Sequence, residues 1–165
     1  MVIDTSALVA ILLDEPERHR FNQQIAADAV RLLSAATLVE TAIVLTSRKG
    51  PGAQAELDLS VAKAALEIVP VRAEPAAIAC DAYRLYGKGR HPAGLNFGDV
   101  FAYALATATG EPLLFKGQDG YPRGARGAVA LSLTCAVVAL GGPLVCSAAY
   151  DTWVHLNKCT ETAID

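Results

Sequence analysis

The sequence predicts an α/β fold in which a central parallel sheet carries helices on both faces. Along residues 1–119, short apolar runs alternate with longer stretches of helical apolar spacing. Glycines and prolines fall between these stretches, as expected at the ends of strands and helices. Alternating strands and helices are typical of a parallel sheet with crossover helices. A chain of 165 residues is long enough to bury a core of this kind as one domain.

Four apolar runs are the expected strands, at residues 1–4, 29–33, 68–71 and 113–115. Helical spacing predicts helices over 6–13, 16–27, 34–48, about 53–66, 75–86 and 97–109. Ser6 and Ser34 are plausible caps, and Pro16 and Pro75 suit the first turn of a helix. Gly110 is a normal C-terminal stop. The prediction is therefore a three-layer α/β/α arrangement over residues 1–119.

Acidic residues stand beside apolar segments at four places. Asp4 ends the first strand, Glu40 follows the run 35–39, Asp99 opens a helix, and Asp119 comes just after the last strand. A carboxylate next to a buried segment is costly unless it is paired, hydrogen-bonded or bound to a cation. Ligands of open α/β sheets bind beyond the carboxyl ends of the strands, where Asp4 and Asp119 are expected. The acids therefore suggest a site for a hard divalent ion and phosphodiester chemistry.

The overall charge limits how nucleic acid could bind. The net charge is −3, so there is no general positive field to attract RNA. Contact would need a local basic patch, and Lys88, Arg90 and Lys116 are the candidates for binding the phosphate backbone. The four cysteines lack a CxxC spacing, which argues against a zinc site. With no signal peptide at the start of the sequence, we expect a cytoplasmic protein with reduced thiols.

Residues 120–165 differ in character from the rest. Glycine, proline and arginine dominate 120–127, and the following run 128–149 contains no charged residue. Such a run is long enough to suggest a membrane span. Gly141, Gly142 and Pro143 interrupt it, which favours an apolar tail of unknown structure over a span. We therefore predict two parts: a nuclease-like domain at 1–119 and an atypical C-terminal extension at 120–165.

The order of the acidic motifs resembles a known family. The opening segment 1–8, the segment around Glu40, the stretch 87–99 ending in Asn96-Phe97-Gly98-Asp99, and the segment 113–117 resemble PIN-domain ribonucleases. More narrowly, they resemble VapC-type toxins of bacterial toxin–antitoxin pairs. The resemblance covers about residues 1–119. Beyond this point the chain departs from the family. These toxins usually continue with an aspartate–phenylalanine pair and a short final strand, and this chain does not.

The resemblance implies a function and a role for each acid. It implies a magnesium-dependent endoribonuclease toxin, with Mn²⁺ as a substitute ion, held in check by a cognate VapB-type antitoxin. Asp4 and Asp99 match the metal-binding aspartates, Glu40 matches a third central acid, and Asp119 aligns with a fourth, more variable acid. The hydroxyl of Thr5 or Ser6 is expected to order the site. The family also implies a homodimer.

Other interpretations remain open from the sequence alone. Asp4 could be a helix cap, Glu40 a solvated helix residue, Asp99 a first-turn acid facing a helix dipole, and Asp119 a turn residue. A catalytically impaired domain that only binds antitoxin or RNA is the main alternative function. A haloacid-dehalogenase-like phosphatase is less favoured, since that chemistry needs a second aspartate where this chain has Ser6.

Overall fold

The computed structural model describes residues 1–117, and residues 118–165 lie outside this description. Asp119 and the charge-free run 128–149 are therefore not among the described residues. The described chain forms a four-stranded sheet in the order β3-β2-β1-β4. Its strands are β1 (Val2–Ile3), β2 (Leu32–Ser34), β3 (Glu67–Val69) and β4 (Leu113–Leu114). All three neighbouring pairs are parallel, which confirms the predicted sheet.

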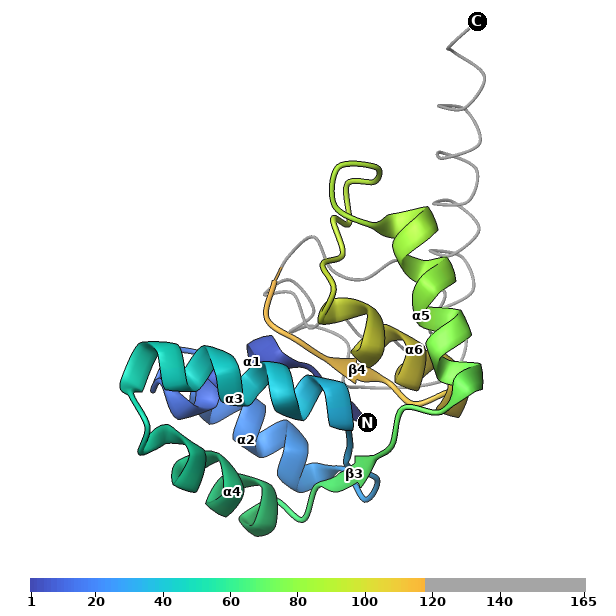
Figure 1. Ribbon diagram of the computed structural model, residues 1–165. Coiled ribbons are helices and arrows are strands. Elements are labelled where there is room, and N and C mark those ends of the chain that lie inside the picture. The colour runs from blue at the N-terminus through green and yellow to red at the C-terminus, as the bar shows by residue number, and fades with distance from the viewer. Residues whose placement is uncertain (118–165) are drawn as a thin grey trace, which may run out of the picture. The chain divides into compact units, whose positions relative to one another are not determined.

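Helices connect these strands in the predicted order. They are α1 (Thr5–Leu12), α2 (Arg18–Ala27), α3 (Ala35–Lys49), α4 (Ala53–Lys63), α5 (Ala73–Tyr86) and α6 (Asp99–Thr109). Figure 1 shows α5 and α6 on the other side of the strands from α1 and α2. The described part of the chain is therefore a three-layer α/β/α structure.

Alternation of side chains along the short strands divides the core between the two faces of the sheet. Val2, Leu32 and Leu113 point to one face and pack with α5 and α6. Ile3, Leu33 and Leu114 point to the other face and pack with α1 and α2. This is the period-two pattern of a pleated strand. It explains why each strand needs only two or three apolar residues to join both layers.

Some helix starts differ from the prediction. The cap of α1 is Asp4 and not Ser6, because the Asp4 side chain accepts a hydrogen bond from the backbone N–H of Ser6. Helix α2 begins at Arg18, so Pro16 lies in the turn before it rather than in its first turn. Ser34 precedes α3 but makes no capping hydrogen bond. Gly110 does end α6, in the left-handed conformation (φ 72°) that favours glycine.

The strand order determines where the first candidate site residue lies in the sheet. The chain runs outward from β1 to β2 and β3, and then returns to the other side of β1 with β4. Carboxyl ends of parallel strands meet at one edge, and ligands bind where the strand order reverses. Asp4 follows β1 at this point. Among the described helices, none is long and apolar enough to cross a membrane.

Candidate active site

Asp4 is a buried carboxylate at the centre of this edge. Its exposed fraction is 2%, and its Oδ1 accepts hydrogen bonds from the backbone nitrogen (2.9 Å) and hydroxyl (2.6 Å) of Ser6. The Ser6 hydroxyl oxygen in turn accepts a hydrogen bond of 2.9 Å from the backbone nitrogen of Lys116, just beyond β4. Asp4 also faces the positive end of the α1 dipole. Its charge is thus fixed between the ends of β1 and β4.

Glu40 reaches the same place from the second turn of α3. Its half-buried carboxylate accepts a hydrogen bond from the hydroxyl of Thr5, with Oγ1 and Oε2 2.5 Å apart. Behind Thr5, the hydroxyl of Thr41 lies 3.4 Å from Thr5 Oγ1 and donates to the carbonyl of Thr37 at 2.7 Å. All three threonines are buried. They form a polar support that links α1 to α3 and orients Glu40.

The surroundings of Glu40 disfavour its negative charge. Burial is the largest effect and raises the pKa of the Glu40 carboxyl above its ordinary value of 4.5. The hydrogen bond from Thr5 lowers this pKa, and the nearby charge of Asp4 raises it. Two neighbouring carboxylates in a partly buried site give this edge a negative potential. Such a region is suited to a cation.

Asp99 begins α6 and is built into a tight turn. Its Oδ2 accepts a hydrogen bond of 2.7 Å from the backbone nitrogen of Asn96. The Asn96 Oδ1 accepts hydrogen bonds from the backbone nitrogens of Gly98 (2.6 Å) and Asp99 (2.9 Å). These reciprocal bonds follow the pattern of a capping box, in which two side chains three residues apart each accept a hydrogen bond from the other residue's backbone N–H. They give the segment Asn96-Phe97-Gly98-Asp99 one defined conformation.

This turn lies directly against Glu40. The Glu40 carboxylate occupies the space next to the Gly98 Cα, where any larger residue would place its Cβ. The structure therefore gathers Asp4, Glu40 and the turn that carries Asp99. Within residues 1–117, no three His, Cys, Asp or Glu side chains converge as a set that could hold a metal ion. The turn that carries Asp99 thus contacts Glu40, but within the described residues Asp99 completes no such set with Asp4 and Glu40.

The three basic residues predicted to contact RNA lie in different settings. Lys88 and Arg90 are exposed in the loop between α5 and α6, where the Arg90 guanidinium lies 5.9 Å from the ring centre of Tyr83. The Lys116 ammonium pairs with Glu15 (2.6 Å) and Glu17 (3.1 Å). The hydrogen bond to Glu15, followed by that to Glu17, raises the pKa of Lys116. Binding of RNA by these three residues stays a prediction.

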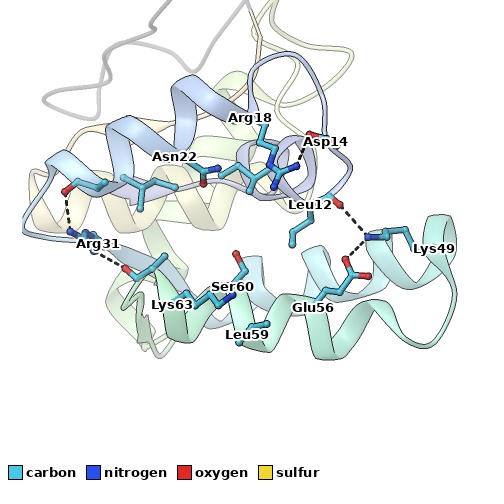
Figure 2. A pocket seen from close by; sticks show the side chains of 14 residues that line it. Leu12, Asp14, Arg18, Asn22, Arg31, Lys49, Glu56, Leu59, Ser60 and Lys63 are labelled. Carbon is cyan, nitrogen blue, oxygen red and sulfur yellow. Dashed lines mark hydrogen bonds and ion pairs between the residues drawn. The ribbon is translucent and has the colours of Figure 1, made fainter.

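A separate pocket of about 650 Å³ lies between α2 and α4 and contains none of the predicted site residues. Figure 2 shows charged side chains around it that are already paired. Arg18 pairs with Asp14 at 2.6 Å, Lys49 pairs with Glu56, and Arg31 donates to the carbonyl of Ala64 at 2.9 Å. The candidate acidic site at the sheet edge is therefore separate from this pocket.

Comparison with known proteins shows the family to which this chain belongs. The model of the PIN domain family matches residues 1–126. The chain therefore belongs to the PIN-domain family.

Within that family, the chain is similar to VapC ribonucleases, as the motifs predicted. It is 56% identical over 119 residues to ribonuclease VapC30 of Mycobacterium tuberculosis, covering 72% of this chain and 91% of the relative. It is also 56% identical over 118 residues to ribonuclease VapC of Mycolicibacterium smegmatis, covering 72% of this chain and 92% of the relative. These matches confirm the resemblance stated from the sequence.

Similarity in three dimensions supports the same fold. The crystal structure of Mycobacterium tuberculosis VapC20, a sarcin–ricin loop cleaving toxin, matches with a TM-score of 0.58 and 20% sequence identity. The match covers 72% of this chain and 91% of that chain. At this identity the likeness concerns the fold, and it confirms the predicted α/β/α arrangement.

Sequence reasoning missed part of the site. It expected a hydroxyl from Thr5 or Ser6, but it did not identify Thr41 or Gly98. Thr41 stands four residues after Thr37 on the same helix, a spacing that allows its hydroxyl to reach the Thr37 carbonyl. Gly98 lies inside the segment Asn96-Phe97-Gly98-Asp99, whose resemblance to the family assigns no role to the glycine. Their roles depend on contacts with distant segments, which no local pattern contains.

Proposed function

We propose that this chain is a magnesium-dependent endoribonuclease toxin of the VapC kind. The observation that supports it best is the pair Asp4 and Glu40, joined through Thr5 at the carboxyl end of β1, with the Asp99 turn against Glu40. The related proteins that carry the name ribonuclease support the same reaction class. Asp119 remains a proposed fourth acid outside the described residues.

The donors at this edge suit a hard divalent ion. Asp4, Glu40 and Asp99 offer only oxygen atoms, and Mg²⁺ prefers oxygen ligands and keeps several of its waters, so one or two carboxylates suffice. Asp4 and Asp99 would hold the ion, with Mn²⁺ as a substitute. When bound, the ion would neutralise the phosphate oxygens and lower the pKa of a bound water. The raised pKa of Glu40 fits this proposal, because a cation would relieve the repulsion between Glu40 and Asp4.

The acidic and basic residues of the chain have different roles in this proposal. Asp4 is fixed by Ser6 and the start of α1, so it offers its charge from a rigid position. Glu40 is oriented by Thr5, which suits it to hold a water molecule or a proton near the reacting phosphate. Lys88, Arg90 and Lys116 would contact the RNA backbone and position the substrate without reading its sequence.

The partners follow from the same proposal. We infer that a VapB-type antitoxin neutralises this chain, and that the active form is a homodimer. RNA is the substrate, as the names of the relatives suggest for their own activity. A domain that binds its partners without cleaving RNA is the second candidate. The observation that favours it is the Asp99 carboxylate, which is engaged in its own turn and completes no three-acid set within residues 1–117.

Cleavage of structured RNA by the purified full-length protein distinguishes the two candidates. The ribonuclease proposal predicts cleavage that needs Mg²⁺ or Mn²⁺, stops with EDTA and is lost in Asp99→Asn. Asn at position 99 can still accept the hydrogen bond from Asn96, so the turn is retained. A folded wild-type protein that cleaves no RNA with either ion would support the binding-only function.

A further inference from the structure

Gly98 is unusual because its backbone does not require glycine. It lies just before α6 with φ −72° and ψ −43°, the ordinary right-handed helical region that every L-residue adopts. Glycine in a helical conformation is less favourable than alanine, since it loses more backbone entropy on folding. A reason for glycine here must therefore be sought in the space around it.

That space is filled by the Glu40 carboxylate. A Cβ built on Gly98 would lie 1.9 Å from Oε1, 2.0 Å from Cδ and 2.0 Å from Oε2 of Glu40. Real Cβ atoms do not make contacts this short, so a side chain at position 98 and the present position of Glu40 exclude each other. The obstructing atoms are the end of a flexible side chain. An alanine would therefore displace the carboxylate rather than prevent folding.

A displaced Glu40 carboxylate would lose its contacts in the candidate site. In its present place, Glu40 accepts the 2.5 Å hydrogen bond from Thr5 and lies beside Asp4. Gly98 is also fixed, since its backbone nitrogen donates to Asn96 Oδ1 at 2.6 Å and Asp99 follows it directly. Gly98 is therefore the point where the acid of α3 meets the turn that carries the acid of α6.

We propose that Gly98 is a positioning residue, whose missing side chain leaves the space that seats the Glu40 carboxylate against Thr5 and beside the Asp99 turn. The contact itself is independent of any activity. Its effect on catalysis rests on the proposed ribonuclease function, so the two are tested separately.

The contact is tested by a double-mutant cycle of folding stability that combines Gly98→Ala with Thr5→Val. In the wild-type background, Thr5→Val removes the hydrogen bond to Glu40 and should lower the folding equilibrium constant about tenfold. In the Gly98→Ala background that bond is already broken, so the same change should lower it by less than about twofold. An equal loss in both backgrounds would overturn the proposal.

Gly52 provides a matched control. It precedes α4 in the same helical conformation (φ −65°, ψ −17°), and a Cβ built on it meets no atom within 4 Å. Gly52→Ala should leave the effect of Thr5→Val unchanged. Should Gly98→Ala fail to fold, Gly98→Ala combined with Glu40→Ala decides the matter. Folding restored by the second change supports the proposal, and failure of this pair beside a folded Glu40→Ala overturns it.

Kinetics of RNA cleavage test the catalytic consequence. Gly98→Ala should lower kcat by roughly 10- to 100-fold with little change in KM, because a displacement of about 1 Å is costly in a positioned site. Added to Glu40→Gln, it should cause no further loss, since both act through one carboxylate. Additive losses would overturn the positioning role in catalysis. If the wild-type protein cleaves no RNA, the ribonuclease proposal fails, and the stability cycle still decides the role of Gly98.

Discussion

The hydroxyl of Thr5 donates a 2.5 Å hydrogen bond to Oε2 of Glu40 and joins the first residue of α1 to the second turn of α3. These residues are 35 positions apart in the chain. The bond places a glutamate beside the buried Asp4, in a site where burial and like charge both oppose its ionisation. Thr5 is therefore central to how this protein keeps two acids together.

Replacing Thr5 by valine should destabilise the protein at neutral pH. Valine has the same shape but no hydroxyl, so Glu40 loses its donor and the pKa of its carboxyl rises further. A hydrogen bond to a charged group contributes about 1.5–3 kcal/mol, and the half-buried position of Glu40 favours the lower end of that range. Chemical denaturation at pH 7 measures the loss. Thr5→Ser keeps the hydroxyl and serves as the control, and equal stability of the valine and serine variants would refute this role.

The raised pKa of Glu40 should also appear in the pH dependence of stability. Between the ordinary pKa of 4.5 and the raised folded value, the folded metal-free protein binds more protons than the unfolded chain. The unfolding free energy contributed by Glu40 therefore falls as the pH rises through this window. Glu17 and Asp28 have lowered pKa values and act in the opposite direction, since their stabilising contributions are lost as the pH falls.

Comparing the wild type with Glu40→Gln isolates the contribution of Glu40 to the pH dependence of stability. We expect the wild type to lose stability relative to Glu40→Gln as the pH rises above 4.5, because glutamine has the same length and no charge to suppress. Denaturation curves of both proteins in EDTA at a series of pH values provide the comparison. A difference between the two proteins that stays constant with pH, or grows in favour of the wild type, would show that the pKa of Glu40 is not raised.

Lys116 offers a test of how RNA reaches the site. Its ammonium is shared by Glu15 and Glu17 on the surface, so exchanging it should change stability little. If it also contacts phosphate, Lys116→Gln should weaken RNA binding and reduce the salt dependence of binding by about one phosphate contact. Titrations of labelled RNA at several salt concentrations measure both quantities. Arg18→Gln, at a cation paired beside the α2–α4 pocket, is the control and should leave both unchanged.

The order of strands and helices could be predicted because the signals are local. Short apolar runs became strands, and the α6 helix stopped at Gly110 as expected. The start of α2 was misplaced, because a proline is compatible with both the turn before a helix and its first turn. Local signals therefore fixed the elements to within a few residues.

The contacts inside the site could not be predicted from the sequence in the same way. The sequence indicated Asp4, Glu40 and Asp99 as a group, but it could not show that Thr5 orients Glu40 or that Gly98 makes room for it. Both contacts join segments that are distant along the chain, so they appear only when the sheet and the helices are assembled. The binding of Asp99 to Asn96 was also unforeseen, although Asn followed three residues later by an acid has the spacing of a reciprocal cap.

We propose that acids from separate parts of the chain bind one divalent ion, and titration with Mn²⁺ followed by electron paramagnetic resonance shows whether they do. We expect the full-length wild type to bind Mn²⁺, Mg²⁺ to displace this ion, and Asp4→Asn to lower the affinity for Mn²⁺ at least about tenfold. Asparagine caps a helix as well as aspartate does, so this variant should remain folded. Equal Mn²⁺ affinity in both proteins, or no binding by the wild type, would refute a shared metal site at these acids.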